Sequence, residues 1–182
     1  KEIALGNNAG DVAIIAGTYS VGAGGTLMLG DGTSLSVTST GRLEVVGSSS
    51  ALATVTRNAT GWYNFTVEGT IAAKYYLFEY MSGAGIYLTS TSAIDNANNF
   101  SEGTFRYGAN DGPLLRVENM QSFVAPNYIA NVIFPINPGD AYNVAKTTAT
   151  SGTLEFYNAT GIFSGEDFEN DPFNLINWTG PV

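Results

Sequence analysis

Residues 18–49 form four consecutive units of eight residues, which read TYSVGAGG, TLMLGDGT, SLSVTSTG and RLEVVGSS. In the last three units the second position is Leu and the fourth is Leu or Val. Because side chains alternate between the two faces of a strand, each aliphatic pair lies on one face and the residue between them on the other. Each unit then ends in Gly, Ser, Thr or Asp, which favour turns. The pattern predicts many short strands at even spacing.

Two all-β architectures are compatible with such strands. In a right-handed parallel β-helix, or solenoid, three units would make one coil of about 20 to 25 residues. In an antiparallel β-sandwich or jelly roll, the same units would be hairpin strands, and Asp31-Gly32 is a hairpin signal. We favour the β-helix because the strands are very short and the turns differ in chemistry from unit to unit.

Strand-like alternation continues to about residue 157, and no segment has the periodicity of a helix. No linker divides the chain, so residues 1–182 are predicted to form a single β-rich domain. Residues 1–17 are predicted to be an N-terminal arm or a first strand. Residues 162–182 form a closing segment that is acidic, aromatic and irregular.

Composition limits the partners and the chemistry of the chain. The formal net charge is −9, which disfavours nucleic acid, and no apolar run is long enough to predict membrane insertion. The chain contains no Cys and no His, so thiolate metal sites and histidine general bases are excluded. Only 13% of residues are charged, about half the usual share. We interpret this Ser-, Thr-, Asn- and Gly-rich composition as that of an extracellular or cell-surface protein.

Two stretches carry a resemblance to a known class of proteins. GGTLMLGDGTSLSVTSTGRLEVVG resembles the coils of parallel β-helix modules in large exported bacterial surface proteins and adhesins. SGEDFENDPFNLINW resembles the acidic, Asp-Pro-containing, Trp-ending segment that often finishes such modules. The resemblance implies surface display, adhesion or structural assembly, and it supplies no catalytic residues.

The open ends of a solenoid suggest how such a chain would act. Unpaired strands at an end must be covered or used, and contacts that do not close into a ring produce filaments. Our first hypothesis is an extracellular structural or adhesin-type subunit that assembles head-to-tail with itself, or within a larger surface assembly. The predicted contact residues are Val12, Ile14 and Ile15 at one end and Phe173, Leu175, Ile176 and Trp178 at the other.

Four carboxylates lie within six residues of the closing segment: Glu166, Asp167, Glu169 and Asp171. Calcium binds through several oxygen ligands, so this cluster is a candidate calcium site. The spacing does not match an EF-hand loop, and runs of charge are usually solvated. We therefore favour an acidic turn that caps the fold, and expect no other cofactor.

A second hypothesis is a carbohydrate-binding or polysaccharide-active β-helix module. Trp62, Tyr76, Phe78 and Tyr80 would then form an exposed aromatic row that stacks on sugar rings. Glu79 lies on the opposite face of this strand, so the face of Tyr76 is the better candidate for the core.

Enzymatic activity is the least favoured function. A carboxylate-dependent polysaccharide lyase or hydrolase would need acids and bases gathered in one groove. The acidic and basic residues in the middle of the chain are more typical of surface ion pairs. The residues in question are Lys74, Asp95, Glu102, Arg106, Asp111, Arg116 and Glu118.

Five Asn-X-Ser/Thr sequons are compatible with a surface glycoprotein. They are at Asn58, Asn64, Asn99, Asn158 and Asn177.

Overall fold

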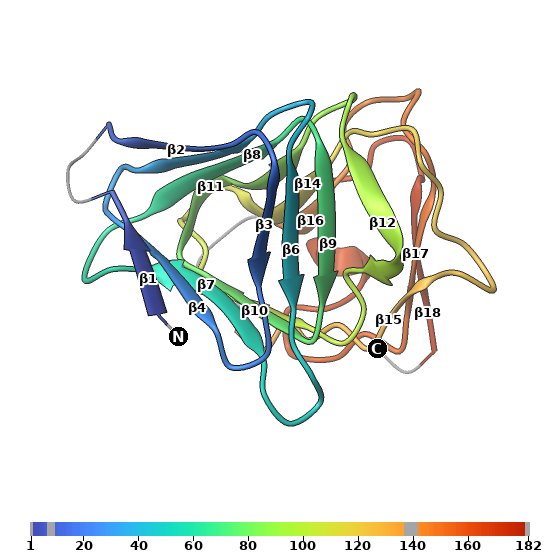
Figure 1. Cartoon of the computed structure of the whole chain (residues 1–182). Coiled ribbons are helices and arrows are strands. Elements are labelled where there is room, and N and C mark those ends of the chain that lie inside the picture. The colour runs from blue at the N-terminus through green and yellow to red at the C-terminus, as the bar shows by residue number, and fades with distance from the viewer. Residues whose placement is uncertain (1, 7–9, 137–141, 181–182) are drawn as a thin grey trace.

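The computed structural model describes residues 2–6, 10–136 and 142–180, and within them the chain forms a parallel β-solenoid of about seven coils. All pairings between its named strands are parallel, so the parallel β-helix is confirmed and the antiparallel sandwich is wrong. Figure 1 shows the short strands stacked along the solenoid, with β3, β6, β9 and β12 side by side on the near face. No helix among the described residues is long and apolar enough to cross a membrane.

Three faces run along the solenoid, and strands of successive coils pair within each. Face A consists of β1 (Glu2–Leu5), β4 (Thr26–Leu29), β7 (Ala53–Arg57), β10 (Tyr76–Glu79) and β13 (Thr104–Arg106). Face B consists of β2 (Val12–Ile15), β5 (Ser34–Val37), β8 (Tyr63–Val67), β11 (Met81–Leu88), β14 (Pro113–Val117) and β16 (Tyr142–Ala145). Face C consists of β3 (Thr18–Val21), β6 (Arg42–Val46), β9 (Thr70–Lys74) and β12 (Ala93–Asn99). Later coils continue it with β15 (Ile129–Ala130), β17 (Leu154–Tyr157) and β18 (Ile176–Thr179).

Each eight-residue unit of the sequence is one strand followed by one corner. The four units contain β3, β4, β5 and β6 in order, so three units complete a coil. Thr18 accordingly pairs with Arg42, 24 residues later, on face C. The next coil is longer, because Arg42 pairs with Thr70. Asp31-Gly32 lies in a corner between parallel strands instead of a hairpin, with Gly32 at a positive φ of 67°.

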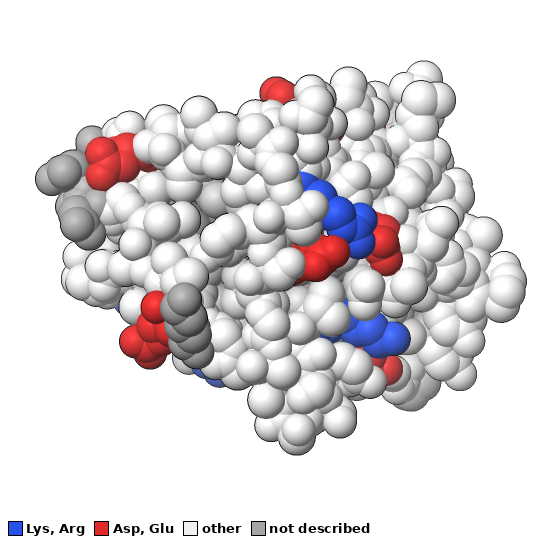
Figure 2. All heavy atoms as spheres, in the orientation of Figure 1, with Lys and Arg blue, Asp and Glu red and all other residues white. Residues whose placement is uncertain are grey.

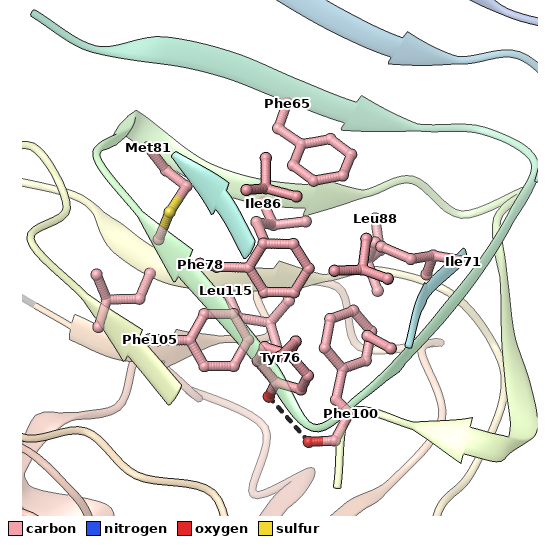
Figure 3. Close-up of a cluster of buried hydrophobic side chains, with 14 of the residues drawn as sticks. Phe65, Ile71, Tyr76, Phe78, Met81, Ile86, Leu88, Phe100, Phe105 and Leu115 are labelled. Atoms are coloured by element: carbon pink, nitrogen blue, oxygen red, sulfur yellow. Dashed lines mark hydrogen bonds between the residues drawn. The ribbon is translucent and has the colours of Figure 1, made fainter. Parts of the chain in front are cut away.

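The core is built by the inward residue of each strand. The aliphatic pairs of the repeated units are buried there, and later coils replace them with aromatic rings. Figure 3 shows Tyr76, Phe78, Phe100 and Phe105 turned toward one another, with the Tyr76 hydroxyl donating to the Phe100 carbonyl oxygen over 2.8 Å. The Phe105 and Phe134 rings then stack at 5.6 Å. Because the inward side chains of successive coils stack on one another, they form a continuous apolar column along the solenoid.

The alternation of β10 breaks down at Tyr80, the residue that follows the strand. Tyr76 and Phe78 are fully buried, which confirms that their face is the core. Tyr80, however, adopts a positive φ of 62° and turns the chain into the next corner. Met81 is therefore the next fully buried residue, and Tyr80 is left half-buried at the surface.

Candidate assembly and binding surfaces

The two ends of the solenoid are finished differently. At the N-terminal end, β1, β2 and β3 each stand at the end of a sheet, so one edge of each strand faces away from the molecule. The sequence predicts an arm or a first strand within residues 1–17, whereas two strands, β1 and β2, lie there. The inward residues of this first coil are only partly covered, including Ile3, Leu5, Ala13 and Tyr19. An edge of this kind can pair with another strand.

The outward residues of β2 add an apolar pair to that open edge. Val12 is 59% exposed and Ile14 is 65% exposed, whereas Ile15 points into the core. One coil further in, the residues aligned with Val12 and Ile14 are Ser34 and Ser36. The outer surface of face B is thus apolar at β2 and polar in the next strand, β5.

The closing segment covers the other end. Phe163 is buried and packs against the half-buried ring of Phe168, at 5.0 Å between ring centroids. Phe168 belongs to a short 3-10 helix, η1 (Glu166–Phe168) (Figure 1). We call this part of the closing segment, residues 163–169, the C-terminal cap. The buried amide of Asn143 donates to the carbonyl oxygens of Phe163 and Gly165 and fixes this cap.

The predicted contact residues of the closing segment are distributed between core and surface. Ile176 is buried, Leu175 is half-buried, and Phe173 is 47% exposed. Trp178 is half-buried and stacks on Phe156 at 4.6 Å, extending the aromatic column. Only Phe173 of this group is presented openly to a partner.

The four carboxylates of the closing segment do not converge. Glu166 and Asp167 are exposed, while Asp171 accepts hydrogen bonds from the backbone N–H groups of Phe173 and Ile176. Among the described residues, no group of three or more such side chains is placed to hold a metal ion. The calcium hypothesis thus gains no support from this geometry.

Glu169 has a different environment from the other three. Its Oε2 accepts a hydrogen bond of 2.5 Å from the indole N–H of Trp178. Burial raises the pKa of Glu169 to about 7, and the neighbouring charges of Asp171 and Glu166 act in the same direction. This carboxyl group is therefore a titratable element of the C-terminal cap near neutral pH.

An aromatic corner lies between face A and face B. The rings of Tyr80 and Tyr107, at equivalent positions of successive coils, stack at 5.2 Å. The Arg57 guanidinium lies 3.7 Å from the centroid of the Tyr80 ring and 5.9 Å from that of Trp62. Of the predicted stacking row, Tyr76 and Phe78 are thus excluded by burial, and Tyr80 is packed between Arg57 and Tyr107. Trp62, 38% exposed, is the member with most free surface.

A groove of about 350 Å³ lies at another corner, where face C turns into face A. One wall is a ladder of side chains from three successive coils, Glu102, Asn131 and Asn158. Asn158 Nδ2 donates to Asn131 Oδ1 over 2.6 Å, and Asn131 Nδ2 donates to Glu102 Oε1 over 2.7 Å. The other lining residues are Ser49, Leu52, Tyr75, Gly103, Thr104, Ile133 and Thr160.

The ladder arises from one repeated backbone geometry. Tyr75, Glu102, Asn131 and Asn158 all have φ between 50° and 62° at the same corner. This left-handed region is disfavoured for most residues but is tolerated by Asn. The sequence alone does not show that Glu102, Asn131 and Asn158 are neighbours, because coils of unequal length conceal their alignment.

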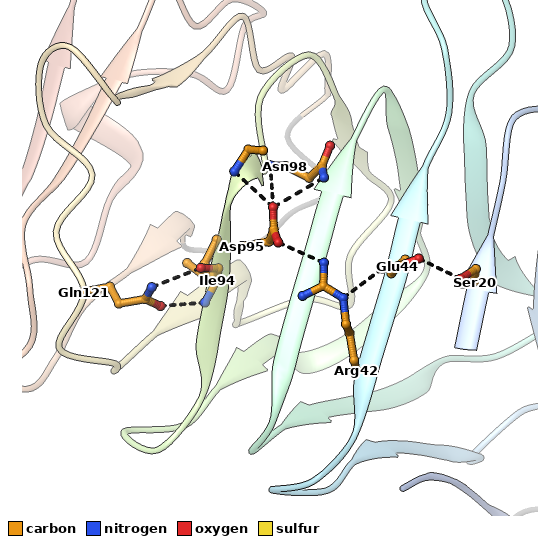
Figure 4. Close-up of polar contacts among 8 residues, drawn as sticks. Ser20, Arg42, Glu44, Ile94, Asp95, Asn98 and Gln121 are labelled. Carbon is orange, nitrogen blue, oxygen red and sulfur yellow. Dashed lines mark hydrogen bonds and ion pairs between the residues drawn. The ribbon is translucent and has the colours of Figure 1, made fainter. Parts of the chain in front are cut away.

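Face C carries a polar network that links three of its strands, β3, β6 and β12. Arg42 bonds Glu44 and Asp95, each at 2.8 Å, and Glu44 accepts from Ser20 (Figure 4). Hydrogen bonding by Arg42 lowers the pKa of both carboxyl groups. Figure 2 shows that this face is otherwise largely uncharged. The charged groups of this network pair with one another. We interpret the network as a structural link between strands of different coils.

The residues considered for catalysis are likewise held in separate local contacts. Arg106 pairs with Glu79 at 2.6 Å, and Arg116 pairs with Glu118 at 3.1 Å. Asp95 binds Arg42 on face C, and Glu102 belongs to the groove ladder. Lys146 is a further basic residue, and it is fully buried. Its ammonium group donates to the carbonyl oxygen of Val117, and burial lowers the pKa of Lys146 to about 8. These contacts do not gather the named acids and bases into one groove.

The five sequons differ in access. Asn58, Asn64 and Asn177 are exposed. Asn99 is buried, and its amide donates to the carbonyl oxygen of Tyr128, so the folded chain does not present it for modification. Asn158 is half-buried in the ladder.

Comparison with known proteins does not assign the chain to a family. No protein-family model, no curated protein and no solved structure matches it. The fold and the surfaces described above therefore carry the functional argument.

Proposed function

We propose that this chain is an extracellular structural or adhesin-type subunit that associates with further copies of itself through the N-terminal end of the solenoid. The observation that carries the proposal is the apolar pair Val12 and Ile14 on the edge strand β2. The adjacent inner strand β5 has Ser at both aligned positions, and β8 has Asn64 and Thr66 there, so the apolar pair coincides with the edge at which strand pairing is available.

Strand addition provides the physical basis of this association. A strand that pairs with β2 gains backbone hydrogen bonds and covers partly exposed residues of the first coil. Such a strand would also bring its own outward side chains against Val12 and Ile14. In head-to-tail growth the partner strand is β18, the last strand of its sheet, and the exposed Phe173 belongs to the same closing segment.

The test changes only the outward positions of the edge strand. We expect Val12→Lys/Ile14→Lys to abolish assembly, because Lys on an edge strand opposes pairing with a further strand. Ser34→Lys/Ser36→Lys is the matched control, since these residues occupy the same register one coil further in. Assembly is measured by sedimentation velocity and negative-stain electron microscopy, and folding by thermal unfolding.

The outcomes separate assembly from the fold itself. Filaments or oligomers from the wild type and the Ser34/Ser36 variant, but monomers from the Val12/Ile14 variant, would support the proposal. A monomeric wild type at high concentration, or undiminished assembly of the Val12/Ile14 variant, would overturn it. Loss of assembly in Phe173→Ser as well would identify the growth as head-to-tail.

A further inference from the structure

The geometry points to a second site, independent of assembly: the groove between faces C and A binds a neutral oligosaccharide. Its volume of about 350 Å³ lies within the range of small-molecule sites in proteins. The groove crosses several coils, whose strands repeat at about 4.8 Å. A polymer with a short repeat, laid along the solenoid, would therefore meet similar groups at each coil.

The ladder offers oriented hydrogen-bonding groups along this path. Each Asn Nδ2 carries two N–H groups, of which the ladder uses one, so a second donor is left for a ligand. The Oδ1 atom of Asn158 and the second carboxylate oxygen of Glu102 are acceptors outside the ladder bonds. Because the ladder fixes the side chains in advance, less conformational entropy is lost when a ligand binds.

The remaining lining suits the ring faces and hydroxyl groups of a sugar. Tyr75 contributes an aromatic ring, and Leu52 and Ile133 contribute apolar surface. Thr104 and Thr160 lie on either side of Ile133 in successive coils and add hydroxyl groups that both donate and accept. Sugars present apolar ring faces between polar hydroxyl groups, so they complement a wall with both kinds of surface.

The charges of the groove lining and of the whole chain favour a neutral ligand. The lining contains one carboxylate, Glu102, and no Lys or Arg. The chain as a whole has a net charge of −9. Both features repel uronic acids and sulfated sugars, and leave neutral hexose or N-acetylhexosamine polymers as the class that fits.

The test removes the ladder amides without straining the backbone. Asn131→Gly/Asn158→Gly deletes both side chains at positions of positive φ, a conformation that Gly adopts readily. Asn174→Gly is the matched control, because Asn174 also has a positive φ of 54° but lies outside the groove. Tyr75→Gly provides an independent variant on the other side of the site, and hydrogen exchange verifies that each variant is folded.

The probes are hexasaccharides of glucose, mannose, galactose and N-acetylglucosamine, with hexagalacturonate as the acidic comparison. Binding is followed by titration calorimetry and by shifts of the Asn side-chain amide resonances. We expect at least one neutral hexasaccharide to shift the signals of Asn131 and Asn158. The double Gly variant should lose at least about tenfold in affinity, as expected for two hydrogen bonds. The Asn174→Gly control should bind like the wild type.

Several results would overturn the proposal. These are absence of binding to every neutral hexasaccharide, preference for hexagalacturonate, or unchanged affinity in the double Gly variant. An equal loss in the Asn174→Gly control would also overturn it, because the effect would then not arise in the groove.

Discussion

At the scale of single residues, the closing segment contains a carboxyl group whose ionisation opposes folding. Glu169 has a pKa of about 7 in the folded chain, well above the ordinary value near 4.5. Between these two values the unfolded chain releases its proton first, so the folded state binds more protons. Stability should therefore fall as the pH rises from about 4.5 to about 7.

We expect Glu169→Gln to remove this pH dependence. Gln has no charge to bury, and its Oε1 can still accept from the Trp178 indole N–H. At pH 8 the variant should be more stable than the wild type by about 1 kcal/mol, a value discounted because the group is only half-buried. That gain corresponds to roughly 2–4 °C in Tm. Thermal unfolding from pH 4 to pH 8 measures it.

Glu166→Gln is the control, because it removes the same charge from an exposed position three residues earlier. A Glu169→Gln variant that follows the wild-type pH profile would show that Glu169 is not the responsible group.

The surroundings of single site residues are the least predictable feature of the sequence. Period-two alternation correctly placed Tyr76 and Phe78 in the core, but it also implied that Tyr80 lay on the same face. A positive φ at Tyr80 breaks the alternation, and strand periodicity carries no signal of such a residue. The groove was missed for a related reason, since Asn131 and Asn158 become neighbours only after the coils have been aligned.

At the scale of elements, the eight-residue units were sufficient to predict the early coils. Alternating aliphatic pairs and polar corners define both the strands and the direction of their side chains, so β4, β5 and β6 could be predicted from the sequence. β1 was missed, because its four residues have one free edge and an incompletely covered inward side. Residues 93–136 are also less regular, since β12 shifts register between Ile94 and Asn99.

A side chain replaces strand pairing where this register shifts. Gln121 Oε1 accepts from the backbone N–H of Ile94 at 2.5 Å, and Gln121 Nε2 donates to the Ile94 carbonyl oxygen at 3.0 Å. Its amide group thus imitates the peptide group of a neighbouring strand (Figure 4).

We expect Gln121→Ala to expose this part of β12 to solvent exchange. The Ile94 amide should lose protection in hydrogen exchange, and the free energy of unfolding should fall by about 1–3 kcal/mol, because two backbone groups lose their partner. Met120→Ala, at the exposed neighbouring position, should leave the Ile94 amide protected. Equal exchange of Ile94 in both variants would contradict this role for Gln121.

At the scale of the whole molecule, the net charge opposes the assembly that the apolar N-terminal end favours. The proposed assembly buries apolar residues at the N-terminal end, but every copy has a net charge of −9. The C-terminal end also carries the four carboxylates of the closing segment. Repulsion between copies should therefore limit assembly when the solution contains little salt.

We expect assembly to increase when NaCl is raised from about 0.01 M to about 1 M, which shortens the Debye length from about 30 Å to about 3 Å. Light scattering at constant protein concentration measures the effect. The Val12→Lys/Ile14→Lys variant should remain monomeric throughout. Assembly that weakens with salt would indicate an interface held by ion pairs instead of apolar strand edges.

The unequal coils have a consequence for how such a molecule can change during evolution. Aligned residues are 24 apart between Thr18 and Arg42 and 30 apart between Ser34 and Asn64, yet the strands on both sides keep their pairing. Extra residues are taken up at the corners, as in the loop that carries Ser49 and Leu52 to the edge of the groove. Insertions at a corner can therefore create new recognition surfaces while the stacked strands, and the register that they share, are inherited unchanged.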